Sequence, residues 1–405
     1  MELKNSFDQS PQVASGDIGV ISSRRSFIRL VGGGAVLAAV VPLTGCNAQL
    51  PEAAVQPWRS ADRETDMRRF MLAHALLAPN PHNLQPWIAD LREPGRIHLN
   101  CDSERVLPET DPFGRQILIG FGAFIELAVI AAAHRGVSVR VELFPAGAPP
   151  ERELPKGSRV ATLVLGEPGS AIADPLFAQI VRRHTRKSAY ANDRALPETL
   201  LRSWDETASR FGLRSGVAAG AAAMDPIRRI TREAYEIEAT TARTWLESAR
   251  VMRIGPDAIA ANPDGISLNS PMVRALHTIG LFDPMEVPVK GESSLKRVMD
   301  RWVPFETASG FLWLASPDNT RPTQVSAGRA YVRSHLLATA AGVDMHPLSQ
   351  ALQEFPEMRG PYVAMHKTLG LTGSGETLQM LSRVGFANEP RGPSPRRSLD
   401  SLLRT

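Results

Sequence analysis

The chain has 405 residues, of which 43% are hydrophobic, enough for one large or two ordinary domains with apolar cores. Positive and negative residues are mixed along the chain, and the formal net charge is only +4. So small and dispersed a charge argues against nucleic acid as a partner, because nucleic-acid-binding proteins concentrate lysine and arginine on one face.

Residues 1–45 have the pattern of an export signal. The motif Ser23-Arg24-Arg25-Ser26-Phe27-Ile28-Arg29 is typical of the twin-arginine route, and the apolar run 30–43 is shorter than the roughly 20 residues of a membrane span. The run ends in Leu43-Thr44-Gly45-Cys46, which resembles the lipobox of bacterial lipoproteins. We therefore expect twin-arginine export to the periplasm or cell envelope and a lipid anchor on Cys46, with a poorly formed transmembrane anchor as the alternative. Since this route carries folded proteins, it implies a cofactor inserted before export.

Cys46 and Cys101 are the two cysteines of the chain. If Cys46 is acylated, Cys101 has no partner within the chain, so we expect no disulfide framework. Residues 46–59 are predicted to be a tether, and a helix capped by Ser60 or Asp62 is predicted to follow as far as residue 77. On that helix we expect His74 to be a packed side chain rather than a metal ligand.

The next segment, Ala78-Pro79-Asn80-Pro81-His82-Asn83-Leu84-Gln85-Pro86-Trp87, is rich in proline and asparagine. Such a composition is incompatible with an α-helix and predicts a stiff loop. A stiff loop holds backbone carbonyls and side-chain amides in fixed directions, which suits the edge of a planar heterocycle. A plain rigid connector is the alternative.

Hydrophobic periodicity predicts the elements that follow. We expect strands at 87–91 and 96–100, a buried helix at 117–134 that is apolar on all sides, and strands at 137–143 and 161–165.

The second part of the chain repeats this plan. Residues 328–343 align without a gap on residues 122–137, and both segments are helices rich in small residues that end in Gly-Val and precede a strand. Matches of this length are common among alanine-rich helices, so the repeat only suggests two similar halves. Between them, 198–253 is predicted to be helical and 254–289 a long irregular insertion of the kind that forms lids.

The segment 181–190 is the strongest candidate for a binding site. It combines Arg182, Arg183, Arg186 and Lys187 with Thr185 and His184, and we expect it at the end of a short helix over 174–181. The cations complement the partial negative charge of a helix C-terminus, which is one interpretation. The other is an anion site, in which an arginine and a hydroxyl bind a phosphate and a lysine contacts a second electron-rich group.

Other known motifs are absent from the sequence. It has no Gly-x-Gly-x-x-Gly, no Walker loop, no Gly-x-Ser-x-Gly and no Cys/His spacing typical of a metal site. Classical dinucleotide binding, serine hydrolysis and a structural zinc site are therefore unsupported.

At residues 79–87 and 182–190 the chain resembles the nitroreductase superfamily of FMN proteins, specifically the Acg-type subfamily, in which two nitroreductase-like halves are fused. The resemblance extends over about 62–403. It implies that Arg183 and Thr185 hold the FMN phosphate side and that Lys187 lies near flavin N1 and the C2 carbonyl. It also implies that the loop carrying Pro79, Asn80, Pro81 and Asn83 reaches the flavin from the other half.

Two further segments match the family. Ser349 and Gln350 fall where relatives offer a backbone amide to flavin N5, and Arg396 and Arg397 match a basic C-terminal element that closes on the phosphate. A flexible basic tail is the alternative for the latter. The chain departs from the family at Asn80 and Pro81, where relatives often carry serine, and the first half lacks its own phosphate motif, so we expect one flavin per chain.

The sequence thus predicts an α+β protein of nitroreductase fold. Its first half spans 60–170, and its second half, 171–405, carries an insertion at about 254–290 as a lid, so that a monomer mimics a dimer. The resemblance implies an FMN-dependent oxidoreductase that reduces an electron-poor small molecule through flavin N5; the alternative is a non-catalytic flavin-binding or storage protein with a covered flavin. Outside the cytoplasmic membrane a membrane quinol or a redox partner would have to replace nicotinamide as the electron donor.

Overall fold

A computed structural model describes residues 49–191, 194–388 and 392–404. The expected signal sequence and lipobox lie outside these residues. Residues 48–405 form one compact unit.

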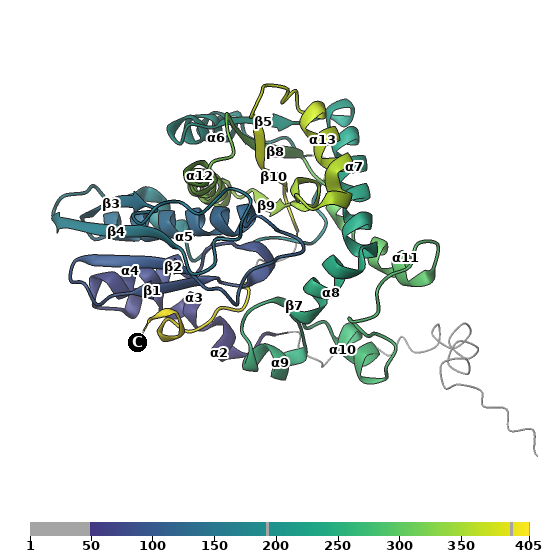
Figure 1. The fold of residues 1–405 in the computed structure, drawn as a ribbon, viewed down its shortest axis with the longest axis horizontal. Coiled ribbons are helices and arrows are strands. Elements are labelled where there is room, and N and C mark those ends of the chain that lie inside the picture. Colours follow the sequence, from purple (N-terminus) through teal and green to yellow (C-terminus); the bar gives the residue numbers. More distant parts are fainter. Residues whose placement is uncertain (1–48, 192–193, 389–391, 405) are drawn as a thin grey trace, which may run out of the picture. The chain divides into compact units, whose positions relative to one another are not determined.

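The first half is built around an antiparallel sheet with the strand order β1-β2-β4-β3 (Figure 1). The predicted strands and the long helix are all present. The elements of this half are α2 (Glu52–Val55), α3 (Pro57–Ser60), η1 (Ala61–Arg63), α4 (Met67–Ala75), η2 (Pro81–Asn83), β1 (Trp87–Asp90), β2 (Arg96–Cys101), α5 (Arg115–His134), β3 (Val137–Leu143), β4 (Arg159–Pro168) and η3 (Pro175–Gln179).

The second half has an antiparallel sheet with the order β5-β8-β10-β9 and, in the insertion, a small parallel pair β6-β7. Its elements are α6 (Glu198–Arg210), β5 (Arg214–Ala218), α7 (Ala221–Thr240), α8 (Ala242–Arg250), β6 (Met252–Ile254), α9 (Gly255–Ala261), β7 (Ile266–Leu268), α10 (Pro271–Thr278), α11 (Ser293–Asp300), η4 (Val303–Glu306), β8 (Gly310–Ser316), α12 (Arg321–Ala340), β9 (Asp344–Pro347), η5 (Gln350–Leu352), η6 (Pro356–Met358), α13 (Arg359–Thr368), β10 (Thr377–Gly385) and η7 (Asp400–Leu402).

The two large sheets have the same topology. In each, a 20-residue helix follows the second strand, the next strand lies at the sheet edge, and the last strand pairs between that edge and the second strand. The prediction of an α+β fold with two similar halves is confirmed.

The matching helices α5 and α12 pack against each other where the repeat aligned them. A Cβ on Gly122 would lie 2.0 Å from the carbonyl oxygen of Val325, and a Cβ on Gly328 would lie 1.9 Å from that of Ile119. The two glycines therefore mark the crossing point, because no side chain fits between the helix backbones there. Among the described residues, α5 is the one helix long and apolar enough to span a bilayer, but most of it is buried in the core, as predicted.

Four predicted segments differ from the structure. The expected tether contains the short helices α2 and α3, and the stretch 198–253, expected to be helical, contains strand β5 of the second sheet. The helix expected from Ser60 or Asp62 begins only at Met67, because the Asp66 carboxylate accepts the amide of Arg69 at 2.9 Å and caps α4 there. The insertion is less irregular than expected, since it contains α9, α10 and the strand pair β6-β7. The short hydrophobic runs of this region carry too little periodicity to reveal such elements.

The C-terminal segment returns to the first half. Leu403 forms a parallel bridge with Ala89, and the amide of Arg404 donates to the Ala89 carbonyl at 2.8 Å. The amide of Arg396 donates to the Ala54 carbonyl at 2.8 Å. The basic tail is thus packed onto α2 and β1, and the interpretation as a flexible tail is wrong for this part.

Candidate functional site

The proline- and asparagine-rich loop has an unusual backbone. His82, Asn83 and Gln85 have φ angles of 48°, 53° and 54°, in the left-handed region that residues other than glycine seldom adopt. Such conformations cost about 1–3 kcal/mol each and persist only where the surroundings enforce them, often at functional sites. The predicted stiff loop contains a short 3₁₀ turn, η2.

Hydrogen bonds hold this loop in place. The Asn80 Oδ1 atom accepts the amide of Gln85 at 2.8 Å. The Gln85 side chain is fully buried; it donates to the Pro263 carbonyl at 3.0 Å and accepts the amide of Arg397 at 2.9 Å. The loop is therefore fastened both to the insertion and to the C-terminal tail.

Arg183 and Arg396 meet at the C-terminal end of α4. Both donate to the carbonyl of Leu77, from Nη2 atoms at 2.9 and 3.1 Å, and both lie over the Trp58 ring with centroid distances of 5.8 and 5.1 Å. Carbonyls beyond the last turn of a helix lack intrahelical partners, so the guanidinium groups satisfy them. The first and last parts of the chain and the central basic segment meet at this point.

The two guanidinium groups differ in how many of their N–H donors are already hydrogen-bonded to the protein. Arg396 spends its N–H groups on the protein, donating to Leu76, Ala78 and the Asn83 Oδ1 atom among others. In contrast, the Nε and Nη1 atoms of Arg183 are buried without a hydrogen-bond partner. Arg183 is therefore the member of the pair with donors available to a bound anion.

The charges of this pair are not neutralised by the protein. Burial lowers the pKa of Arg183 to about 10, and burial together with the Arg183 charge lowers that of Arg396 to about 9, so both are cations at neutral pH. Among the described residues, no carboxylate offsets this effect on either guanidinium. Burying an unpaired charge costs several kcal/mol, so the pair favours an anion from outside the chain.

The segment after Arg183 runs beside β9. Thr185 forms a parallel bridge with Met345, and the amide of Arg186 donates to the Met345 carbonyl at 3.3 Å. The short helix expected before this segment is the 3₁₀ helix η3, and the basic residues continue from it as extended chain.

Lys187 lies between the loop and β9. Burial lowers the pKa of His82 in the loop, to about 4, and that of His346 in β9, and the charge of Lys187 lowers both further. Lys187 is itself solvent-accessible, yet desolvation by the surrounding protein lowers the pKa of its ammonium. The predicted residues of both halves therefore face a common region.

The residues expected near flavin N5 lie directly after β9. Ser349 and Gln350 follow β9 at the start of η5, and the Gln350 side chain bonds to the carboxyl of Glu238, together with Gln353. Burial raises the pKa of Glu238 to about 7. No interaction among the described residues joins Ser349 or Gln350 directly to Arg183.

Three site residues were not anticipated. Trp58 lies in what was predicted to be a tether, and Gln85 was expected only as part of the loop. Glu238 is half-buried, and the many charges of its helix gave no sign that its carboxyl would be desolvated. Arg397 donates to the Gln85 carbonyl at 3.4 Å and to that of Ser401 at 2.7 Å, so it holds the tail to the loop.

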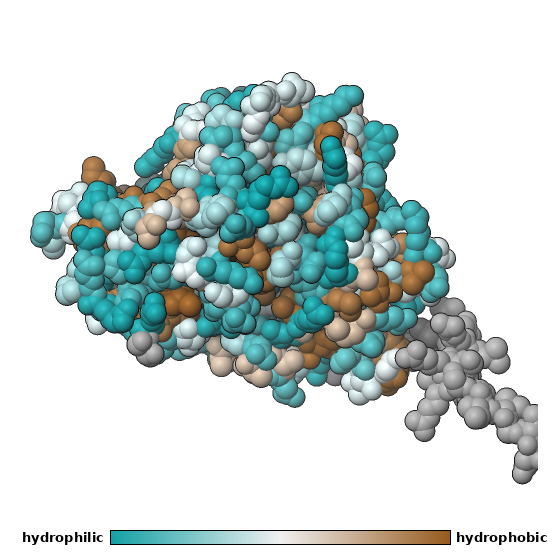
Figure 2. Space-filling view, viewed as in Figure 1, coloured by the Kyte–Doolittle hydropathy of each residue, from teal (hydrophilic) through white to brown (hydrophobic). Residues whose placement is uncertain are grey.

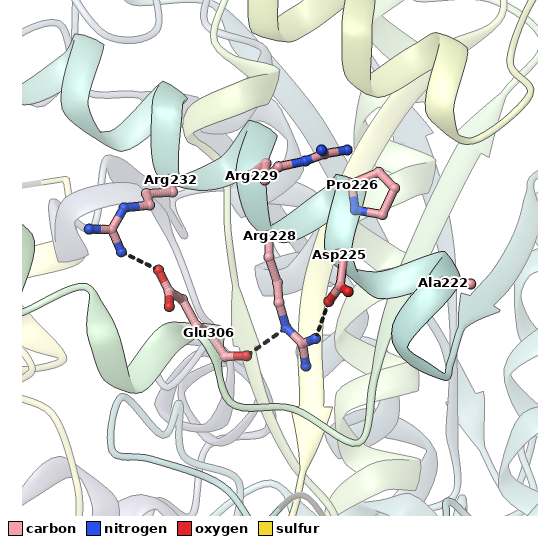
Figure 3. Close-up of a pocket in the computed structure, with 7 residues that line it drawn as sticks. All are labelled: Ala222, Asp225, Pro226, Arg228, Arg229, Arg232 and Glu306. Carbon is pink, nitrogen blue, oxygen red and sulfur yellow. Dashed lines mark hydrogen bonds and ion pairs between the residues drawn. The ribbon is translucent and has the colours of Figure 1, made fainter.

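A separate hollow of about 690 Å³ lies along α7 and shares no lining residue with this site (Figure 3). Two of its three arginines are paired: Arg228 donates to Asp225 Oδ1 at 2.8 Å, and Arg232 forms an ion pair with Glu306. The third, Arg229, is exposed. The hollow is open to solvent and its charges are largely balanced. Among the described residues that line it, none has a buried hydrogen-bond donor without a partner. We do not assign it a function.

The chain is similar to proteins of Mycobacterium tuberculosis. It is 27% identical over 350 residues to one whose name contains "NAD(P)H nitroreductase", covering 83% of this chain and 90% of the relative. A second, named NAD(P)H nitroreductase acg, is 28% identical over 84% of this chain and 96% of its own. No family model matches the chain.

Solved structures show only a distant likeness. The FMN-dependent nitroreductase NfnB of Mycobacterium smegmatis, in complex with NADPH, is 18% identical, with a TM-score of 0.36 over 56% of this chain and 96% of its own. An iodotyrosine deiodinase bound to FMN and 3-iodo-L-tyrosine is 14% identical, with a TM-score of 0.33 over 55% of this chain and 95% of its own. At these scores we base no argument on either.

Proposed function

We propose that the chain is an FMN-dependent oxidoreductase of the nitroreductase type that reduces an electron-poor small molecule by two electrons. The similarity to the mycobacterial relatives, over most of both chains, supports the nitroreductase type. The site residues support a cofactor that carries a phosphate.

The observation that carries the proposal is the pair of unsatisfied hydrogen-bond donors on Arg183. This buried guanidinium has two nitrogens without partners and no neutralising carboxylate among the described residues, and it lies beside a second buried cation. A phosphate of nearly two negative charges would accept charge-assisted hydrogen bonds from Nε and Nη1 and offset both cations. A neutral ligand would do neither.

The remaining predicted residues suit the rest of FMN. Lys187 brings a positive charge near His82 of the first half and His346 of the second, and a cation beside a flavin ring stabilises its reduced, anionic form. Thr185 is fixed by its bridge to β9, and the strained loop presents fixed amide groups. FMN, when bound, would supply the two-electron chemistry; the protein supplies position, charge and exclusion of water.

The test is FMN binding by two variants of neighbouring arginines. Arg183→Ala should weaken binding about tenfold to a hundredfold, since one charge-assisted hydrogen bond contributes about 1.5–3 kcal/mol. Arg182→Ala is the matched control, because Arg182 is exposed, and it should bind within twofold of the unmodified chain. Binding is measured by quenching of flavin fluorescence on titration. A colourless protein that takes up no FMN, or equal affinities for both variants, would refute the proposal.

A flavin-holding protein without turnover is the second candidate. It is favoured by the insertion, which is held to the first half at two points: the amide of Gly265 donates to the Asn83 carbonyl of the loop at 3.1 Å, and Arg105, after β2, forms an ion pair with Asp264 at 2.6 Å. To separate the two, bound flavin is bleached anaerobically with a reductant and mixed with a nitroaromatic or a quinone. Colour that returns no faster than with free FMN would favour the holding protein.

We further propose that the protein is exported by the twin-arginine route and anchored through an acylated Cys46, as residues 23–29 and 43–46 indicate. A membrane quinol or a redox partner would then supply electrons. Incorporation of labelled palmitate that is lost in Cys46→Ser tests the anchor, and a cytoplasmic, unlabelled protein would refute it.

A further inference from the structure

Exposed apolar side chains are concentrated in one segment. Of the described residues, eight large hydrophobic side chains are exposed, and six of them lie between residues 272 and 303: Met272, Ile279, Leu281, Met285, Val289 and Val303. Figure 2 shows hydrophobic side chains gathered over the region of α10 and α11, at the lower right. Contiguous exposed apolar surface marks an interaction site in most soluble proteins.

The segment is held in a defined conformation. Ser270 caps α10 by accepting the amide of Val273, and the amides of Leu281 and Phe282 both donate to the Leu276 carbonyl. The indole of Trp245 on α8 donates to the Pro284 carbonyl at 2.9 Å. The apolar side chains are therefore presented by a fixed backbone, not by a chain that would fold them inwards.

The position of the segment identifies what covers it. The Asn269 side chain, next to the cap of α10, donates to the carbonyl of Gln49 at 2.9 Å. Gln49 is three residues after Cys46, a distance of at most about 11 Å even in extended chain. A lipid on Cys46 would therefore hold a bilayer surface close to the beginning of α10.

The near-neutral charge of the segment fits a surface that binds lipid through apolar contact rather than through charge. Residues 270–303 carry five basic residues and four acidic ones, so they are nearly neutral, and Lys296 is paired with Asp300 at 2.9 Å. Such a surface gains little from anionic lipid, unlike the basic amphipathic helices that bind by charge. Burial of methionine, isoleucine and leucine side chains supplies the attraction.

We propose that this apolar face, formed by Met272, Ile279, Leu281, Met285 and Val289, rests on the phospholipid bilayer to which Cys46 is anchored. The inference depends on the acylation of Cys46 proposed above but not on FMN. It adds a second contact to the lipid anchor and fixes how the protein sits on the membrane.

The experiment uses the acylated full chain, extracted from cells and reconstituted in phosphatidylcholine vesicles. Met272→Cys is labelled with an environment-sensitive fluorophore, and Val363→Cys on α13 is the matched control, since Val363 is also an exposed apolar side chain. Cys101 is buried and should stay unlabelled. We expect a blue-shifted emission at 272 that nitroxide-bearing lipids quench at least fivefold more strongly than the emission at 363.

Equal quenching at the two positions would overturn the proposal. So would a blue shift at 272 that appears in detergent without vesicles and grows with protein concentration, because a second copy of the chain would then cover the face. A double variant, Met272→Ser with Ile279→Ser, and a fluorophore at Leu281→Cys give an independent check: quenching at 281 should fall severalfold, and unchanged quenching would contradict the role of these side chains. Palmitate labelling and FMN titration of the same preparations separate a failure of this inference from a failure of the anchor or of the proposed function.

Discussion

The crossing of α5 and α12 predicts that an alanine at Gly328 destabilises the protein. The new Cβ would lie 1.9 Å from the carbonyl oxygen of Ile119, whereas ordinary van der Waals contact begins at 3.4 Å, so the helices would have to separate by about 1.5 Å. The clash is with backbone, which cannot rotate away as a side chain can. Overpacking of this kind costs about 1–3 kcal/mol or more, and we expect the upper end because two 20-residue helices must move.

Replacing glycine by alanine inside a helix also stabilises by about 1 kcal/mol, which offsets part of this cost. We therefore expect a net loss of about 2 kcal/mol or more in the free energy of unfolding, measured by urea denaturation followed by circular dichroism. Gly360→Ala in the first turn of α13 is the control, because, among the described residues, nothing but its chain neighbours lies near its Cβ position. Since Pro361 follows and disfavours a helical alanine before it, the helix gain should be largely cancelled there. The loss at Gly328 should thus be much larger than any change at Gly360. A Gly328→Ala protein as stable as the unmodified chain would show that the two helices do not meet at this point.

Two further predictions follow from buried ionisable groups. Burial raises the pKa of Glu238 to about 7 from an unfolded value near 4.5, so the folded state holds the proton more tightly and stability falls as the pH rises from about 4.5 to 7. Glu238→Gln should remove this slope and be more stable relative to the unmodified chain at pH 8 than at pH 4.5, by up to about 3 kcal/mol in urea titrations; a difference independent of pH would contradict it. Burial raises the pKa of the Cys101 thiol to about 12, so in a Cys46→Ser chain it should react with a thiol reagent only after unfolding, and rapid reaction in the native state would contradict its burial.

The sequence predicted those parts of the fold that have a strong local pattern. Residues 137–143 alternate and form β3, and the apolar run 117–134 lies within α5. The gapless alignment of Gly328 on Gly122 identified the two residues that touch at the crossing. By contrast, the cap of α4 is decided by which of several nearby polar residues reaches a free amide, and composition does not distinguish Asp66 from Asp62.

The sequence indicated candidate site residues but not the separate contacts that each of them makes. Arg183 and Arg396 were both expected to bind a phosphate. The structure shows that Arg396 donates hydrogen bonds to the carbonyls of Leu76, Leu77 and Ala78. Two nitrogens of Arg183, by contrast, have no hydrogen-bond partner among the described residues. The surroundings of the Glu238 carboxyl depend on hydrogen bonds from Gln350 and Gln353, which lie more than a hundred positions away in the sequence. Such long-range contacts have no signature in a single sequence.

The return of the C-terminal segment to the first half bears on how the protein is made. Arg396 reaches the Leu77 carbonyl and the Asn83 side chain, so the surroundings of Arg183 are complete only once residue 396 has been synthesised. A cofactor held there could then be captured only late in synthesis. A translocation route that accepts only folded cargo would then carry the chain only after Arg396 has reached its place beside Arg183.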